Sequence, residues 1–280
     1  MSRRNSRSNA ATKSKPKRRN VHKVGFNSNF EPIRNYEDDF QYHSKTGKIC
    51  TIDRHVHKSA INLSNMKELE PLTDTQEIFF ESYRDSDAFI LYGSAGTGKT
   101  AISLYHALED ILDVDSDFQK IIIVRSIVQT RDVGFLPGDE KEKLAPYEQP
   151  YIQLCADLFG RKDAYEKLKD MGKIEFHPTS FIRGTTFHDS IIIFDECQSA
   201  TFHEISTVIT RIGANSKILL CGDSKQNDLI KTKQDCSGFD QLIAVSDRMH
   251  EFRKIRFTSD GIIRSGIVKS WIKACESLGL

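Results

Sequence analysis

The residues best suited to chemistry form one run, Gly93 to Thr100, which reads G-S-A-G-T-G-K-T and matches the phosphate-binding pattern G-x-x-x-x-G-K-[ST] at every fixed position. Its glycines allow backbone N–H groups to curl around an anion without a Cβ in the way. Lys99 adds a mobile ammonium for the β- and γ-phosphates, and the Thr100 hydroxyl is a hard oxygen suited to Mg²⁺. The run, called the phosphate loop below, predicts binding of a nucleoside triphosphate with Mg²⁺ by Gly93, Ser94, Ala95, Gly96, Thr97, Gly98, Lys99 and Thr100.

The sequence on either side supplies the elements that must position this loop. Ala88 to Tyr92 is an apolar run of strand length, and an amphipathic helix is predicted from about Gly98 to Leu112. The positive end of that helix dipole would point at the same phosphates. A Gly/Ser turn that matched the pattern by chance would lack this strand–loop–helix context.

Two adjacent acids, Asp195 and Glu196, end the apolar stretch that begins at Ile191. In a fold with a phosphate loop, a carboxylate is needed at this place. Asp195 can reach Mg²⁺ through its shell, and Glu196 can polarise the water that attacks the γ-phosphate. The alternative is a merely polar strand end, but the phosphate loop upstream favours the catalytic interpretation.

Two glutamines are further candidates. Gln226 follows a predicted strand in the pattern G-D-x-x-Q, which places it at the carboxyl edge of the sheet, where it could sense the γ-phosphate or orient water. Gln76 lies in the first turn of a helix capped by Thr73 or Asp74, and its amide could pair with the edge of adenine. On position alone, an exposed helical glutamine is the better explanation of Gln76.

Alternating strands and helices joined by short turns predict one doubly wound, mostly parallel sheet. The expected fold class is three-layer α/β, a P-loop NTPase (RecA-like) fold. We predict three parts: a disordered tail at 1–30, an N-terminal extension at 31–66 and the ATPase domain at 67–280. Residues 1–20 hold eight Lys and Arg and no acid, so the tail either contacts nucleic acid or is simply solvated.

Cysteine usage and hydropathy indicate the compartment. The six cysteines contain no C-x-x-C pair, which favours reduced thiols over disulfides or a zinc site. No apolar run approaches the ~18 residues needed to span a bilayer, and residues 1–20 lack the apolar core of a signal peptide. The predicted location is the cytoplasm, with no membrane partner.

Taken together, these segments resemble the PhoH family of bacterial and bacteriophage ATPases, itself similar to the first motor domain of superfamily-one helicases. The resemblance runs from about Pro71 to Leu280. In order, it comprises L-T-D-T-Q, G-S-A-G-T-G-K-T, T-R-D-V-G-F-L-P-G-D, P-Y-x-x-P, F-I-R-G-T-T, D-E-C-Q, G-D-S-K-Q and I-I-R. Two positions depart from the family pattern: Asp132 replaces a common proline, and Ser265 replaces a histidine.

The resemblance implies that ATP and Mg²⁺ are the cofactors and assigns a role to each matched residue. Adenine recognition falls to Gln76, phosphate and metal binding to Lys99 and Thr100, hydrolysis to Asp195 and Glu196, coupling to Gln226, and contact with the γ-phosphate to Arg264. Some relatives also carry an N-terminal ribonuclease domain. The 70 residues that precede the match here show no acidic quartet, so no ribonuclease activity is predicted.

The predicted function is an ATPase coupled to RNA or single-stranded DNA, with helicase activity as one form of coupling. Arg131 and Arg183 could supply a narrow nucleic-acid track on a mildly acidic body. A two-domain helicase closes its ATP site with a second motor domain, for which this chain has no room. Either Arg264 acts within its own subunit or a neighbour in a ring supplies an arginine, so a homo-oligomer is expected.

Two other functions remain open on the sequence. A small-molecule or nucleoside kinase also uses a phosphate loop, although Glu196 favours water as the acceptor and no arginine-rich lid is evident. A GTPase is suggested by Thr232 to Asp235, which resembles the guanine-reading N-K-x-D. That element normally ends a strand, however, and here it follows a polar stretch.

Overall fold

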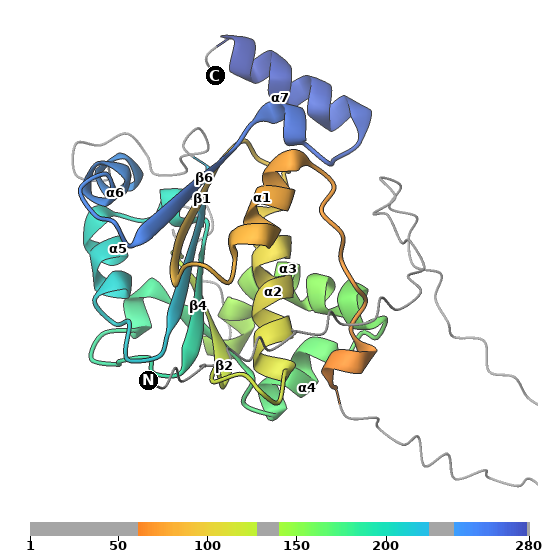
Figure 1. Ribbon diagram of the computed structural model, residues 1–280, viewed down its shortest axis with the longest axis vertical. Coiled ribbons are helices and arrows are strands. Elements are labelled where there is room, and N and C mark those ends of the chain that lie inside the picture. Colours follow the sequence, from red (N-terminus) through yellow and green to blue (C-terminus); the bar gives the residue numbers. More distant parts are fainter. Residues whose placement is uncertain (1–60, 128–139, 224–237, 279–280) are drawn as a thin grey trace, which may run out of the picture.

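The computed structural model (Figure 1) describes residues 61–127, 140–223 and 238–278, and all other residues lie outside the described part of the chain. Its centre is a six-stranded sheet in the order β3-β2-β4-β5-β1-β6. Every pairing in this sheet is parallel. The strands are β1 (Ala88–Gly93), β2 (Lys120–Arg125), β3 (Ile174–Pro178), β4 (Ser190–Asp195), β5 (Lys217–Gly222) and β6 (Phe252–Phe257).

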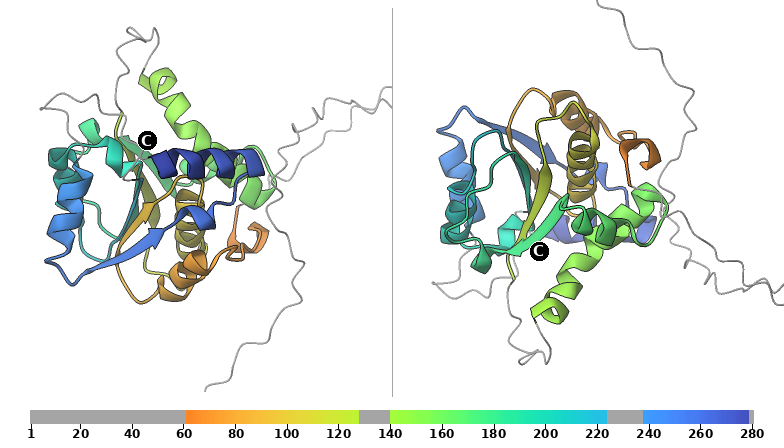
Figure 2. Two further views of the ribbon diagram at one scale, coloured as in Figure 1. Left: turned by 90° about the horizontal axis from the view of Figure 1, so that it is seen from above. Right: turned by 90° about the horizontal axis from the view of Figure 1, so that it is seen from below.

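Helices cover both faces of the sheet. On one face are α1 (Asp74–Ser82), α2 (Lys99–Leu112), α3 (Glu140–Phe159) and α4 (Ala164–Asp170), and on the other are α5 (Phe202–Ile209) and α6 (Phe239–Ser246). The last helix, α7 (Gly266–Leu278), lies across the end of the sheet where the strands finish (Figure 2). Short 3₁₀ turns complete the description: η1 (Leu63–Asn65), η2 (Thr179–Phe181), η3 (Cys197–Ser199) and η4 (Ser259–Gly261).

The alternation of side chains along each strand builds two hydrophobic cores. In β4, Ile191 and Ile193 join the core under α1 to α4, whereas Ile192 and Phe194 join the core under α5 and α6. All four side chains are at most 1% exposed, as expected for a strand buried on both faces of a parallel sheet. The three-layer α/β P-loop NTPase fold predicted from the sequence is confirmed.

The element boundaries differ from the prediction mainly around α3. The sequence from Tyr151 to Lys169 predicts a helical region, but the structure has two helices there, because Gly160 adopts φ +66° and ends α3 in the left-handed conformation that favours glycine. Helix α3 also begins earlier than expected and contains Pro146 and Pro150. Helix α6 was not predicted.

The described end of the predicted N-terminal extension packs on the domain. Ile61 is 3% exposed within the core under α1 to α4, and the partly buried Met66 packs against the same core. The predicted tail at 1–30 and most of the extension lie outside the described residues.

Two chemical predictions from the sequence can be compared with the fold. Four of the cysteines are described, and all are free thiols: Cys155, Cys197, Cys221 and Cys275. Across the described ranges, no helix is both long enough and apolar enough to cross a membrane.

Candidate nucleotide-binding site

The phosphate loop connects the carboxyl end of β1 to the first turn of α2. Gly93, Gly96 and Gly98 have φ values of +115°, +72° and +84°, a region that side chains disfavour. A Cβ on Gly93 would lie 2.0 Å from the carbonyl oxygen of Phe257, which ends the neighbouring strand β6. The glycines are therefore required by the backbone path as well as by the predicted ligand.

The Lys99 ammonium is held by its own loop. Its Nζ donates to the carbonyl oxygens of Gly93 and Ser94, each at 2.9 Å. Burial lowers the pKa of Lys99, and the negative charges of Asp223, Glu196 and Asp195 partly oppose that shift. The Lys99 charge is thus poorly solvated, and the neighbouring acids favour the protonated form that could bind an anion.

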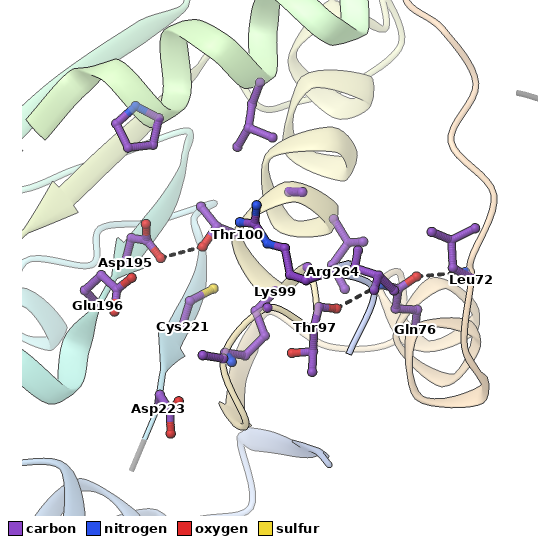
Figure 3. Close-up of a pocket in the computed structure, with 18 of the residues that line it drawn as sticks. Leu72, Gln76, Thr97, Lys99, Thr100, Asp195, Glu196, Cys221, Asp223 and Arg264 are labelled. Atoms are coloured by element: carbon purple, nitrogen blue, oxygen red, sulfur yellow. Dashed lines mark hydrogen bonds between the residues drawn. The ribbon is translucent and has the colours of Figure 1, made fainter. Parts of the chain in front are cut away.

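The predicted acids stand opposite the loop, as Figure 3 shows. The Thr100 hydroxyl donates to Asp195 Oδ1 at 2.7 Å, so the phosphate loop and the end of β4 are in direct contact. Hydroxyl and carboxylate oxygens are hard donors, and Mg²⁺ commonly takes one or two such protein ligands while keeping several waters. The donor set at Thr100 and Asp195 fits Mg²⁺.

Glu196 comes directly after the strand and adopts φ +50°, unusual for a residue that is not glycine. Burial and the adjacent charge of Asp195 raise its pKa. Gln198 Nε2 donates to Glu196 Oε2 at 2.5 Å, while Gln198 Oε1 accepts the backbone N–H of Asp223 at 2.9 Å. Gln198, which is 2% exposed, therefore links the candidate base to the end of β5.

Gln76 lies at the loop rather than on the outer surface. It is 2% exposed, its Nε2 donates to the carbonyl oxygen of Thr97 at 2.9 Å, and its Oε1 accepts the Leu72 N–H at 2.8 Å. The simple alternative of an exposed helical glutamine is wrong. The amide lines the same cavity as the loop and keeps one further N–H and one lone pair for a ligand.

The segment after β6 closes the site from a third side. The Ile263 N–H donates to the Gly96 carbonyl oxygen at 3.1 Å, and Arg264 lines the cavity beside the loop. Farther along α7, Glu276 Oε1 accepts the Ser94 hydroxyl at 2.6 Å. The phosphate loop is thus held in part by residues from the far end of the chain.

These side chains surround a cavity of about 1020 Å³. Sequence reasoning missed Arg125 and Cys221, which line it. It also missed Tyr151, Gln198 and Glu276, which hydrogen-bond to Asp195, Glu196 and Ser94 respectively. Gln198 stands in D-E-C-Q, and Tyr151 follows directly after P-Y-x-x-P, so both were within reach of the motifs. Arg125 ends β2, where a charged residue after an apolar strand was the available clue.

The remaining predicted residues fall elsewhere. Arg131, Gln226 and the stretch Thr232 to Asp235 lie outside the described residues. Arg183 is described and exposed, but it does not line the cavity; its Nη2 lies 3.4 Å from His203 Nε2. Among the described residues, no cluster of three or more His, Cys, Asp and Glu side chains is arranged to hold a metal ion.

The sequence of this chain is similar to those of known proteins. Protein PhoH of Escherichia coli (strain K12) is 30% identical over 203 residues, which cover 72% of this chain and 56% of that protein. Protein PhoH2 of Bacillus subtilis (strain 168) is 40% identical over 142 residues, covering 49% of this chain and 32% of that protein. The chain therefore spans little more than half of the first relative and a third of the second.

Similar solved structures include a bacteriophage terminase and a helicase. The large terminase of a thermophilic bacteriophage in complex with ADP gives a TM-score of 0.45 at 14% identity, covering 72% of this chain and 50% of that one. The Pif1 helicase from Candida albicans gives 0.35 at 15% identity, covering 68% and 40%. A family model described as PhoH-like protein matches residues 68–276, which is well over half of the sequence. The chain therefore belongs to the PhoH-like protein family.

Proposed function

We propose that the chain is a Mg²⁺-dependent ATPase coupled to RNA or single-stranded DNA. The observation that supports it best is the 2.7 Å hydrogen bond between Thr100 and Asp195, which joins the phosphate loop to the end of β4. Glu196 follows immediately and lines the same cavity. A phosphate-binding nest, a metal-compatible oxygen pair and a neighbouring carboxylate are the parts that γ-phosphate hydrolysis needs.

Each residue then has a definite task. Lys99 would exchange its loop carbonyl partners for phosphate oxygens, and Gln76 would present its remaining donor and acceptor to adenine. Mg²⁺, held by Thr100 and Asp195, would neutralise charge on the phosphates. Glu196 would orient and deprotonate the attacking water. The hydrogen bond that Gln198 donates would hold the Glu196 carboxylate in place.

Steady-state hydrolysis, measured with and without RNA, single-stranded DNA and duplex DNA, tests this proposal. We expect release of free phosphate from Mg-ATP and stimulation by one of the single strands, weakening as salt rises. Transfer of labelled phosphate to a metabolite would instead support the kinase. A hydrolysis rate that no nucleic acid changes at any salt concentration would contradict the proposed coupling.

Arg264 is proposed to act on the nucleotide of its own subunit. Its side chain lines the cavity of its own chain, and a Cβ on Gly96 would lie 2.9 Å from its Cγ. Replacing Arg264 by alanine should lower hydrolysis by about 10- to 100-fold, the value of one charge-assisted hydrogen bond. Mixing Arg264→Ala chains with Lys99→Ala chains should not restore activity, and restoration would show that the arginine acts between subunits.

The nucleic-acid contact is proposed to lie where η2 meets the start of α5. Phe181 is 59% exposed and Phe202 37% exposed, and Arg183 Nη2 lies 3.4 Å from His203 Nε2, which follows Phe202. Exposed aromatic rings stack bases, and a guanidinium pairs with phosphate. Glu196 follows the end of β4, and only the short 3₁₀ turn η3 separates it from the start of α5 at Phe202. This short connection offers a route by which ATP hydrolysis could be coupled to nucleic-acid binding.

Replacing Phe181 by alanine should weaken binding of a fluorescent oligonucleotide by roughly 5- to 150-fold, corresponding to about 1–3 kcal/mol for one stacked base. Val114→Ala is the matched control, since Val114 is 95% exposed in a turn away from η2 and α5. Equal affinity of the Phe181→Ala and Val114→Ala chains would exclude this surface.

Self-association is proposed through α7. Ile267, Trp271 and Leu278 are 80%, 71% and 73% exposed, and with Ala274 they repeat at i, i+4, i+7 and i+11, which places them on one face of the helix. An exposed apolar stripe of this size is typical of an interface. Mass determination in the presence of ATP, run beside the hydrolysis assay, reports the assembly.

A further inference from the structure

The Asp195 carboxylate is held through both of its oxygens. Oδ1 accepts the Thr100 hydroxyl at 2.7 Å, and Oδ2 accepts the Tyr151 hydroxyl at 2.8 Å. Tyr151 comes from α3, is 1% exposed, and stands 44 positions before Asp195 in the sequence. Helix α3 thus contributes a hydrogen-bond donor to the site, although it is separated in the sequence from both the phosphate loop and β4.

The Tyr151 hydroxyl can act only as a donor to Asp195. The Tyr151 hydroxyl lies 2.8 Å from Asp195 Oδ2 as the donor, and an ionised carboxylate oxygen can only accept a hydrogen bond. A neutral phenol that donates to a carboxylate stabilises the charged form and restricts its rotation. Removal of the hydroxyl would leave Oδ2 without this donor and the carboxylate with more rotational freedom.

A second tyrosine one turn earlier helps to hold α3 in place. The sequence P-Y-E-Q-P-Y, residues 146–151, repeats Pro-Tyr at an interval of four, which places Tyr147 and Tyr151 on one face of the helix. The Arg125 guanidinium lies 5.9 Å from the centre of the Tyr147 ring. Arg125 is paired in register with Asp195 across β2 and β4, so both tyrosines meet the same end of the sheet.

We propose that Tyr151 is a positioning residue that orients Asp195 for Mg²⁺. This inference rests on the proposed function, since it assumes that Asp195 serves the metal. Thr100 is itself an expected metal ligand, so its bond to Oδ1 is exchangeable for the ion. The bond from Tyr151 to Oδ2 can persist, and it fixes the carboxylate plane with Oδ1 toward the phosphate loop. A residue that hydrogen-bonds to a metal ligand in this way commonly contributes about 10- to 100-fold to metal affinity.

The chain contains a closely matched control. Tyr83 is also 1% exposed, and its hydroxyl donates to Asp110 Oδ2 at 3.0 Å. Neither residue lines the nucleotide cavity. Tyr83→Phe removes the same kind of buried phenol–carboxylate bond as Tyr151→Phe, so the two variants share a structural effect and differ only in the metal site.

The experiment titrates Mn²⁺, a paramagnetic substitute for Mg²⁺, into the full chain saturated with ADP and follows free Mn²⁺ by electron paramagnetic resonance. We expect Tyr151→Phe to weaken Mn²⁺ binding by roughly 10- to 100-fold, whereas Tyr83→Phe stays within twofold of the parent. Both variants should show a lower Tm. Equal Mn²⁺ affinity of parent and Tyr151→Phe would overturn the proposal, because a purely structural role lowers Tm alone.

Two further measurements keep the test decisive. If Tyr151→Phe does not fold, 4-aminophenylalanine at position 151, which keeps a donor on the ring, should retain Mn²⁺ binding near the parental value, and tenfold weaker binding in that folded chain would contradict the proposal. If the parent itself binds no Mn²⁺ in the presence of ADP, the proposed metal-dependent ATPase fails. That result differs from one in which the parent binds and Tyr151→Phe binds equally well.

Discussion

Replacing Glu196 by glutamine should lower steady-state ATP hydrolysis by about 10²- to 10⁴-fold, the usual contribution of a general base, while Mg-ATP binding is retained. Glutamine matches glutamate in shape, and its amide oxygen can still accept the hydrogen bond from Gln198. What it lacks is the charge that takes a proton from water. The loss should therefore appear in kcat and not in the affinity for nucleotide.

The measurement is phosphate release at saturating Mg-ATP, with nucleotide affinity measured separately on the same preparation. Glu175→Gln is the control, because Glu175 pairs with Lys120 and His177 away from the cavity. Hydrolysis by Glu196→Gln within threefold of the parent would assign the base elsewhere. A matching loss in Glu175→Gln would point to a general effect on the fold.

Replacing Lys99 by alanine should strongly weaken the binding of nucleotide. Two charge-assisted hydrogen bonds to phosphate at about 1.5–3 kcal/mol each correspond to a loss of about 10²- to 10⁴-fold in affinity. In the chain without nucleotide, burial disfavours the Lys99 charge, and the Gly93 and Ser94 carbonyl oxygens accept hydrogen bonds from its ammonium. We therefore expect little change in Tm without ligand and no rise in Tm when Mg-ATP is added.

Thermal unfolding with and without Mg-ATP checks both parts of this expectation. Lys120→Ala removes a lysine that pairs with Glu175 on the neighbouring strand, and it should leave the nucleotide-dependent rise in Tm intact. A parental rise in Tm for Lys99→Ala would show that the phosphates do not bind at this loop.

The parts of the fold that sequence predicted well depend on short contiguous segments. A strand buried on both faces must be apolar throughout, as Ile191 to Phe194 is, and the residue that follows it is the first that can be charged. The phosphate loop requires glycine at Gly93, Gly96 and Gly98 because the backbone there adopts positive φ. Such requirements are local, so spacing alone placed these residues at the carboxyl edge of the sheet.

Contacts between distant segments could not be predicted in this way. The bond from Tyr151 to Asp195 depends on how α3 packs, and the bond from Ser94 to Glu276 joins residues 182 positions apart. The two prolines inside α3 also obscured where that helix begins, since proline usually marks a helix start or a break. Gln76 needed the fold to show that its amide is buried against the loop.

The most direct test of the central claim is calorimetric titration of Mg-ATP into the Glu196→Gln chain, which should bind nucleotide without consuming it. The account predicts saturable heat with one site per chain, lost when Lys99→Ala is added to the same chain. A folded Glu196→Gln chain that gives no heat with Mg-ATP, or heat that Lys99→Ala leaves unchanged, would contradict it.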